Sequence, residues 1–222
     1  MNYLLISYKN DSNIGIFGCA NNKIAFFPKD FEKIEEVEKI LKVKVENIKI
    51  WNSNLIGLFV CMNNNGILLP KIVLKDEIEE IKSKSNFLNI GILKTKHTAL
   101  SNLIVCNDKA ALISPLMEKS NLRIIKDVLN VEIEQRKIDD FNLVGSIIKV
   151  TNKGLLAYRD ISEESFEFLK DFFKVKNASI GTVNFGSIFI SSAIIANDNG
   201  ILIGEKTSAY EIERILEALG FV

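Results

Sequence analysis

The sequence has few of the residues that build disulfide frameworks, metal sites and membrane spans. Its 222 residues include three cysteines and one histidine, and no two of the cysteines are close in sequence. An odd number of scattered cysteines argues against a disulfide framework and against a zinc site. The uninterrupted apolar runs are short, such as 67–69, whereas a membrane helix needs about 20 apolar residues. We therefore expect no metal and no membrane association.

Targeting and cofactor motifs are also missing. Residues 1–7 contain no Lys or Arg and soon turn polar, so they do not resemble a signal peptide, and we predict a cytoplasmic protein. The sequence contains no phosphate-binding loop, no paired carboxylates at a telling spacing and no basic stripe with interleaved aromatic residues. The sequence therefore predicts that no cofactor is needed.

Neither sign of charge is in excess. The 28 basic residues balance the 28 acidic residues, and the sequence pI is near 6.6. A protein that binds nucleic acid mainly by neutralising phosphates is usually basic, so any contact with nucleic acid should be small or shared with a protein partner. The hydrophobic fraction of 47% is ample for a buried core.

An internal repeat is the strongest signal in the chain. Five short apolar stretches each follow an asparagine, and the spacings between these asparagines are 41, 48, 40 and 42 residues. We predict that each stretch is a strand. The five leading residues are Asn13, Asn54, Asn102, Asn142 and Asn184.

Each predicted strand runs into a turn rich in asparagine, and a second strand follows. Asn, Asp and Gly tolerate the positive φ angles of tight hairpins, which would explain their presence in these turns. Three of the second strands stop at the only prolines of the chain, Pro28, Pro70 and Pro115. The turns are 21–22, 63–66, 107–108, 152–154 and 197–200, and the second strands are 24–27, 67–69, 110–113, 155–157 and 201–203.

A helix and a third extended segment complete each unit. Apolar residues recur at helical spacing after every hairpin, as at Phe31, Ile34, Val37 and Leu41. Third segments are expected at 45–51, 88–93, 131–136 and 178–183, and the fifth unit lacks one. Residues 3–8 have the same character, so we expect this N-terminal strand to fill the missing place.

These patterns predict an α/β fold in which five ββαβ-like repeats form a closed, pseudo-fivefold ring. One unit alone cannot bury both its sheet and its helix, and closing the ring removes the exposed sheet edge. We predict one domain over 1–222. The repeats cover approximately 3–51, 52–95, 96–138, 139–183 and 184–222.

Three segments resemble a known family. Residues 102–115 (NLIVCNDKAALISP) are similar to the third repeat of the translation initiation factor 6 family, 142–146 (NLVGS) to the fourth, and 181–187 (GTVNFGS) with 196–198 to the fifth. The resemblance spans 13–219 in the expected order, and it is greatest to the archaeal members. It implies the pentein fold, also called the five-bladed α/β propeller.

The resemblance also implies a function and partners. Members of this family bind the large (50S) ribosomal subunit on the face that meets the small subunit. They contact the ribosomal protein uL14 and lie near the sarcin–ricin loop of the large-subunit rRNA. While bound, they block subunit association by steric exclusion, and they act in subunit maturation or recycling. The resemblance therefore implies a non-enzymatic ribosome-binding protein, which we expect to be a monomer.

The candidate ribosome-binding residues follow from the same resemblance. It assigns this role first to Asn102 and its neighbour Ser101. The other candidates are Asn13, Asn54, Asn142, Asn184 and Leu58, where many relatives have arginine. An alternative is equally open: these asparagines could instead hydrogen-bond backbone at a recurring bend.

A pentein enzyme acting on a guanidino compound is the main alternative. Such enzymes use a cysteine nucleophile near the C-terminus together with a histidine, whereas no cysteine follows Cys106 here. Cys19, Cys61 and Cys106 each precede a hairpin turn, where a small, semi-apolar side chain commonly fills buried space. His97 lies in a polar stretch that is typical of an exposed loop. We therefore predict that the protein is not an enzyme.

Overall fold

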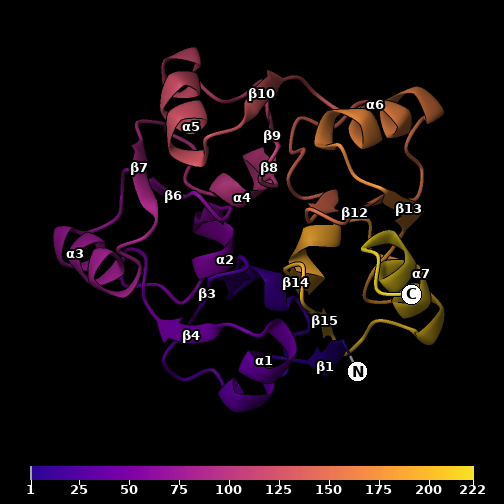
Figure 1. Cartoon of the computed structure of the whole chain (residues 1–222), viewed down its shortest axis with the longest axis horizontal. Coiled ribbons are helices and arrows are strands. Elements are labelled where there is room, and N and C mark those ends of the chain that lie inside the picture. The colour runs from indigo at the N-terminus through magenta and orange to yellow at the C-terminus, as the bar shows by residue number, and fades with distance from the viewer. Residues whose placement is uncertain (1) are drawn as a thin grey trace.

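Five three-stranded sheets are arranged around one axis in the computed structural model, which describes residues 2–222 (Figure 1). In each sheet an inner strand pairs antiparallel with a middle strand, and the middle strand pairs parallel with an outer strand. The inner strands are β2 (Cys19–Ala20), β5 (Cys61–Met62), β8 (Ile104–Cys106), β11 (Ile148–Val150) and β14 (Ile194–Ala196). The middle strands are β3 (Ile24–Phe27), β6 (Gly66–Pro70), β9 (Ala110–Ile113), β12 (Gly154–Tyr158) and β15 (Ile201–Gly204).

The N-terminal strand occupies the place that the fifth unit leaves open. Four outer strands belong to their own units: β4 (Lys44–Asn47), β7 (Asn89–Leu93), β10 (Glu132–Gln135) and β13 (Asn177–Gly181). The fifth is β1 (Tyr3–Ile6), which pairs parallel with β15, with Tyr3 opposite Ile201. The first and last units therefore share one sheet.

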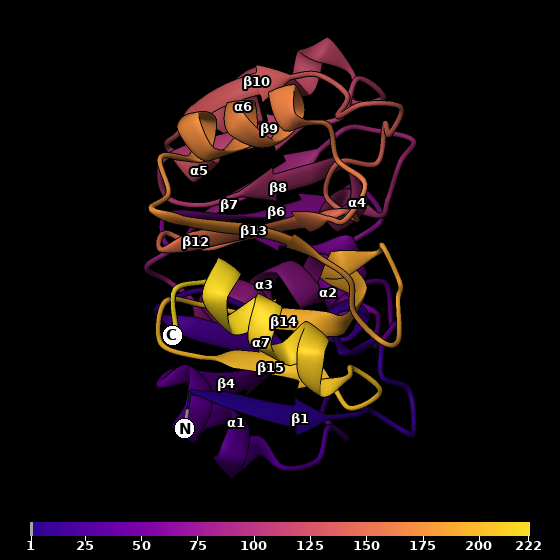
Figure 2. The ribbon, with the colours of Figure 1, turned by 90° about the vertical axis from the view of Figure 1, so that its right-hand side faces the viewer.

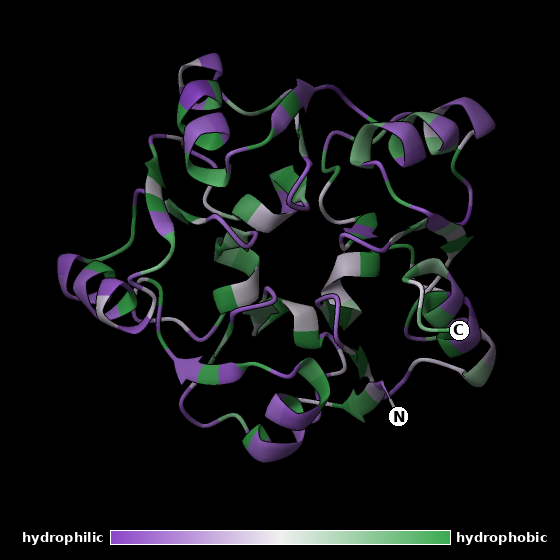
Figure 3. Ribbon diagram, in the orientation of Figure 1, coloured by the Kyte–Doolittle hydropathy of each residue, from purple (hydrophilic) through white to green (hydrophobic). Residues whose placement is uncertain are grey.

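Five amphipathic helices surround the sheets. Figure 3 shows hydrophilic residues on these peripheral helices and largely hydrophobic strands closer to the axis. Ser208 and Glu211 form a capping box at the start of the last helix, and Ser162 caps the helix before it. The helices are α1 (Ile34–Leu41), α3 (Lys75–Lys84), α5 (Leu122–Leu129, preceded by η2, Lys119–Asn121), α6 (Glu163–Phe173) and α7 (Ala209–Ala218).

The first apolar stretch of each unit differs from the prediction. Instead of one continuous strand, four units form a short helical turn and then a strand of two or three residues. A short buried apolar run has the same appearance in sequence whether it is helical or extended. The turns are η1 (Ile14–Ile16), α2 (Ile56–Phe59), α4 (Leu100–Leu103) and η3 (Ile190–Ala193).

Burial is concentrated in the inner and middle strands. All four residues of β3, β9 and β15 are buried, and they pack against the helices of their own or neighbouring units. Across residues 2–222, no helix combines the length and the apolar character that crossing a membrane would require. The ring is thus held together by continuous apolar contact between its units.

Candidate functional site

The two ends of the ring axis are built differently. Figure 2 shows the helical turns α2 and α4 at one end, with the termini at the other. The hairpin turns between inner and middle strands lie at the second end, where they converge on the axis and are seen as hydrophilic loops at the centre of Figure 3. All five units therefore present one set of loops at each end.

A collar of buried side chains joins neighbouring units at the hairpin end. Asn63 accepts hydrogen bonds from the backbone N–H groups of Asn65 and Gly66, and its own amide donates to the carbonyls of Asn107 and Leu129. The full pattern recurs at Asn107 and Asn197; Asn21 donates to a single carbonyl, that of Asn63, and a threonine takes the fourth place without donated bonds. The collar consists of Asn21, Asn63, Asn107, Thr151 and Asn197.

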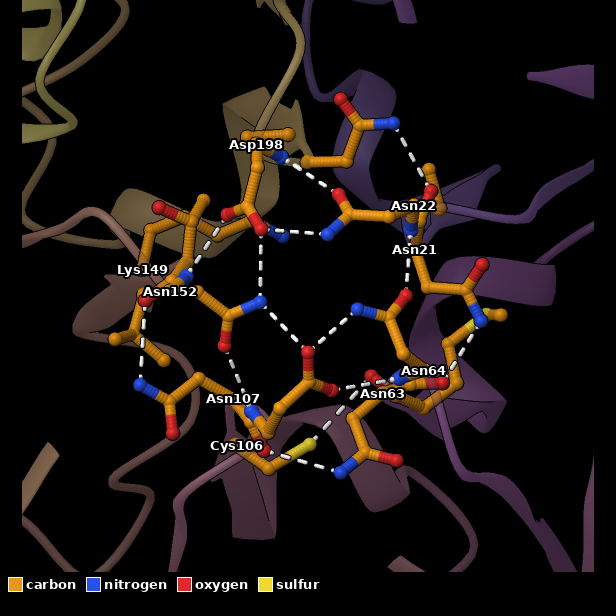
Figure 4. Close-up of a pocket in the computed structure, with 16 residues that line it drawn as sticks. Asn21, Asn22, Asn63, Asn64, Cys106, Asn107, Lys149, Asn152 and Asp198 are labelled. Atoms are coloured by element: carbon orange, nitrogen blue, oxygen red, sulfur yellow. Dashed lines mark hydrogen bonds between the residues drawn. The ribbon is translucent and has the colours of Figure 1, made fainter. Parts of the chain in front are cut away.

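The next residue of every hairpin forms a second, complete ring, which we call the rosette (Figure 4). Each side-chain oxygen accepts the backbone N–H of the preceding unit, at 2.7–3.0 Å, all the way around the axis. Each of the two carboxylates also accepts from two flanking side-chain amides. The rosette consists of Asn22, Asn64, Asp108, Asn152 and Asp198.

The hydrogen bonds of the collar and the rosette replace the explanation given above for the asparagine-rich turns, which was that asparagine tolerates positive φ angles. No collar or rosette residue has a positive φ angle; the residues that do are elsewhere, for example Trp51 and Asn184. Asparagine is needed because one amide can accept two backbone bonds and donate to the next unit. The glycines of these turns have a separate reason, since a Cβ at Gly66 would lie 2.3 Å from the Val128 carbonyl oxygen.

The opposite end carries a hollow of about 330 Å³. Four of the seven predicted ribosome-binding residues line it: Asn13, Leu58, Ser101 and Asn102. The other three, Asn54, Asn142 and Asn184, do not. The remaining lining residues are Gly15, Ile16, Leu143, Ser146, Ser187, Phe189, Ser191 and Ser192.

The five leading asparagines are not equivalent positions, contrary to the spacing argument. Asn13 directly precedes a helical turn, Asn102 lies inside one, and Asn184 sits in an earlier turn at φ 47°. Asn54 and Asn142 each come two residues before the buried residue that starts the next turn, Ile56 or Val144. The true register follows the collar, whose spacing is 42, 44, 44 and 46 residues (21 to 63 to 107 to 151 to 197). Asparagine is frequent in this sequence, and five asparagines fall at a spacing close to that of the repeat without being equivalent positions.

Hydrogen bonding divides the predicted asparagines into two groups. The amides of Asn13, Asn54 and Asn184 are engaged within the protein, for instance by Asn54 donating to Tyr8 Oη at 2.9 Å. The side chains of Asn102 and Asn142 make no hydrogen bond within residues 2–222, although the backbone carbonyl of Asn102 accepts from Gly145. Of the five side chains, that of Asn184 donates to a backbone carbonyl, that of Ser12, whereas Asn13 and Asn54 donate to side chains. Ribosome binding by any of these asparagines stays a prediction.

Exposed aromatic residues near the hollow are the feature that the sequence argument missed. Phe189 lines the hollow and is 51% exposed, and Phe185 in the preceding turn is 81% exposed. The buried Glu211 carboxylate accepts the N–H groups of Phe185 and Gly186, which holds this turn at positive φ. Glu77 does the same for the exposed Trp51 and for Asn52, at 2.7 Å each. The exposed side chains of Phe185 and Trp51 are thus carried by backbone turns that the Glu211 and Glu77 carboxylates hold in place.

The three thiols lie near the axis between the two ends. Burial raises the pKa of Cys19 to about 12. A hydrogen bond with Cys61, whose sulfur is 3.5 Å away, and burial together raise the pKa of Cys106. Thiols that keep their protons are poor nucleophiles. In the part of the chain that the structure describes, no group of three His, Cys, Asp or Glu side chains is placed to hold a metal ion.

Comparison with known proteins agrees with this architecture. Residues 3–218 match the model of the eIF-6 family. Proteins named translation initiation factor 6 are similar along nearly their whole length: 43% identical over 223 residues in Saccharolobus islandicus (99% of this chain, 100% of the relative) and 38% over 225 residues in Pyrococcus abyssi (98% of each).

A solved structure with the same fold is the N-terminal domain of ArgZ, an arginine dihydrolase from cyanobacteria. It superimposes with a TM-score of 0.51 at 10% identity, covering 88% of this chain and 72% of that one. At this identity the likeness concerns the fold alone. The chain thus has the predicted pentein architecture.

Proposed function

Because the chain belongs to the eIF-6 family, we propose that it binds the large ribosomal subunit on the face that meets the small subunit and blocks subunit association by steric exclusion. The match over 3–218 carries this proposal, and it makes the protein a translation initiation factor of archaeal type. A ring whose units hold one another in place is rigid, and a rigid body bound between two ribosomal subunits would keep them apart. We propose the cytoplasm as its location.

We propose further that the hollow end faces the ribosome. The hollow combines Asn102, whose amide makes no hydrogen bond within residues 2–222, with the exposed Phe189, which suits a protein surface that offers both polar and apolar groups. The hairpin end has less to offer, since the collar and rosette satisfy their polar groups internally. In this orientation uL14 would contact the hollow, and the sarcin–ricin loop would lie beside it.

Co-sedimentation with isolated archaeal large subunits tests the binding face. Asn102→Ala should weaken binding about 5–30-fold, the range for losing interface hydrogen bonds worth about 1–2 kcal/mol in total. The matched control is Asn89→Ala, which removes an exposed asparagine beside the hairpin end at the start of β7. If Asn89→Ala weakened binding and Asn102→Ala did not, the hairpin end would be the docking face.

Light scattering of mixed subunits tests the mechanism separately. Saturating protein should prevent association of the two subunits, and the monomeric ring should suffice. Binding without inhibition would leave a role in large-subunit maturation or recycling and would refute steric exclusion.

We also propose that the chain catalyses no reaction, despite its fold likeness to an enzyme domain. All three thiols lie in the first three units, and the pKa values of Cys19 and Cys106 are raised. His97 contributes only its backbone N–H, to Thr95 Oγ1, among the hydrogen bonds of residues 2–222. An electrophilic amidine probe should leave the protein unmodified, and stoichiometric labelling of one cysteine would contradict the proposal.

A further inference from the structure

One layer of the inner strands contains a charge where the other units have none. The hairpin registers place Lys149 opposite Leu156, and the equivalent positions lie opposite Phe26, Leu68, Leu112 and Leu202. Those equivalent residues are Cys19, Cys61, Val105 and Ile195. An uncharged residue like these four would be enough for packing in this layer, so the lysine must be explained by something other than packing.

Lys149 lines two small cavities on the axis, each of about 90 Å³. The cavity on the hairpin side is lined by the collar and rosette, including Asp108 and Asp198. The inner cavity lies toward the hollow, and Gly15, Ser101 and Ser191 line both the hollow and the inner cavity. The inner cavity therefore adjoins the hollow at these three small residues.

The inner cavity contains a single charge. Lys149 is the only charged residue among its lining residues, which include the three thiols Cys19, Cys61 and Cys106. Ten ion pairs are formed within residues 2–222, and Lys149 takes part in none of them. The oxygens of Asp108 and Asp198 in the other cavity are already occupied by rosette amides and N–H groups.

An ammonium in such a position needs a counter-charge. Lys149 is partly buried, so it loses part of its hydration; this loss is costly for an unpaired charge, and a bound ion of opposite sign offsets that cost. Burial lowers the pKa of Lys149, and the thiols oppose this shift. The volume of the cavity admits an ion of a few atoms with some water but is far below that of an ordinary organic-ligand pocket.

We propose that the inner cavity is a binding site for a small monovalent anion of halide size, held by the Lys149 ammonium and reached from the hollow. The anion would neutralise the one charge in the middle of the ring. Because it would bind the folded chain and not the unfolded one, it would also stabilise the ring. This inference does not depend on the ribosome-binding proposal.

Crystals grown in sodium bromide test the site directly, because bromide gives an anomalous diffraction signal. We expect one anomalous peak in contact with Lys149 Nζ in the wild-type protein and none in Lys149→Met. Lys153→Met, which removes a nearby lysine outside these cavities, should retain the peak. Water alone at this position in saturating bromide, or a peak that persists in Lys149→Met, would overturn the proposal.

Thermal unfolding provides a second measurement. At equal ionic strength, sodium bromide should raise the midpoint of the wild-type protein above its value in sodium gluconate, whose anion is too large for the cavity. Lys149→Met should fold, since four units already place uncharged residues in this layer, and it should lose the bromide-specific rise. An equal rise in both proteins would show that bromide acts elsewhere.

Discussion

At the hairpin end of the axis, the amide of Asn63 donates to two backbone carbonyls and its oxygen accepts two N–H groups; at the hollow end, the amide of Asn102 makes no hydrogen bond within the described chain. The same side chain thus holds the ring together at one end and remains available at the other. Residue type alone does not distinguish these two roles. Whether the side-chain amide is hydrogen-bonded within the protein does distinguish them. If the hollow is the binding face, as proposed, an unbonded polar group beside it marks that face better than a repeated residue type does.

The strongest test of this contrast is the stability of two alanine variants. Asn63→Ala leaves three backbone groups without partners, since the Leu129 carbonyl keeps its bond from Asn65, and should lower the free energy of unfolding by about 3 kcal/mol. Asn102→Ala should change it by no more than about 0.5 kcal/mol. Urea denaturation measures both, and equal losses would remove the distinction between the two ends.

A smaller effect is expected where a carboxylate fixes a turn at the hollow end. Burial acts to raise the pKa of Asp139, but hydrogen bonds from Ser162, Tyr158 and Ser165 outweigh it and lower the pKa to about 2. Since the unfolded value is about 3.9, Asp139 stabilises the fold above about pH 4, and this contribution is lost as pH falls toward 2.

Asp139→Asn should therefore lower the free energy of unfolding by about 1 kcal/mol at pH 7, after allowing for the partial solvent exposure of the carboxylate. The difference from the wild-type protein should shrink between pH 4 and pH 2. Asp140→Asn changes the exposed neighbour and is the matched control. A difference that stays constant with pH would show that the Asp139 charge is not what stabilises the turn.

The smallest effect on stability should accompany a large effect on binding. Phe189 is half exposed beside the hollow, so Phe189→Ser should change the free energy of unfolding by at most about 0.5 kcal/mol. Removing an aromatic anchor from an interface typically weakens binding by at least 1–2 kcal/mol, or about 5–30-fold. Unchanged co-sedimentation with the large subunit would place the docking surface away from the hollow.

The ring and its closure could be predicted from sequence because they depend on periodic patterns. Alternating apolar strands, turn residues and helical stripes recur five times, and a spare strand at one terminus matches a missing strand at the other. The short helical turns that begin four of the five units could not be predicted, since a buried run of four apolar residues fits either conformation. Their position decides which residues line the hollow.

The candidate site was only partly predictable for a related reason. Ser101 and Asn102, selected as ribosome-binding residues, line the hollow, and their binding role stays a prediction; Asn54 and Asn184, selected with them, lie outside the hollow and are bonded within the protein. Phe185 and Phe189 gave no signal, because an exposed aromatic residue is identical in sequence to a buried one. Lys149 also gave no signal, because one lysine is not distinctive in a sequence whose charges balance. Its position in an otherwise uncharged layer follows only from the register of the hairpins.

The order of apolar and turn residues along the chain is enough to specify five units and their closure into a ring, since burial of each sheet and helix stripe depends on local periodicity. Three features depend instead on groups from different units: which asparagines bridge units, which remain unbonded, and where the Lys149 ammonium lies at the axis. These groups are 40 or more residues apart in sequence. Such contacts form only when the ring closes, because a hydrogen bond requires both partners at about 3 Å.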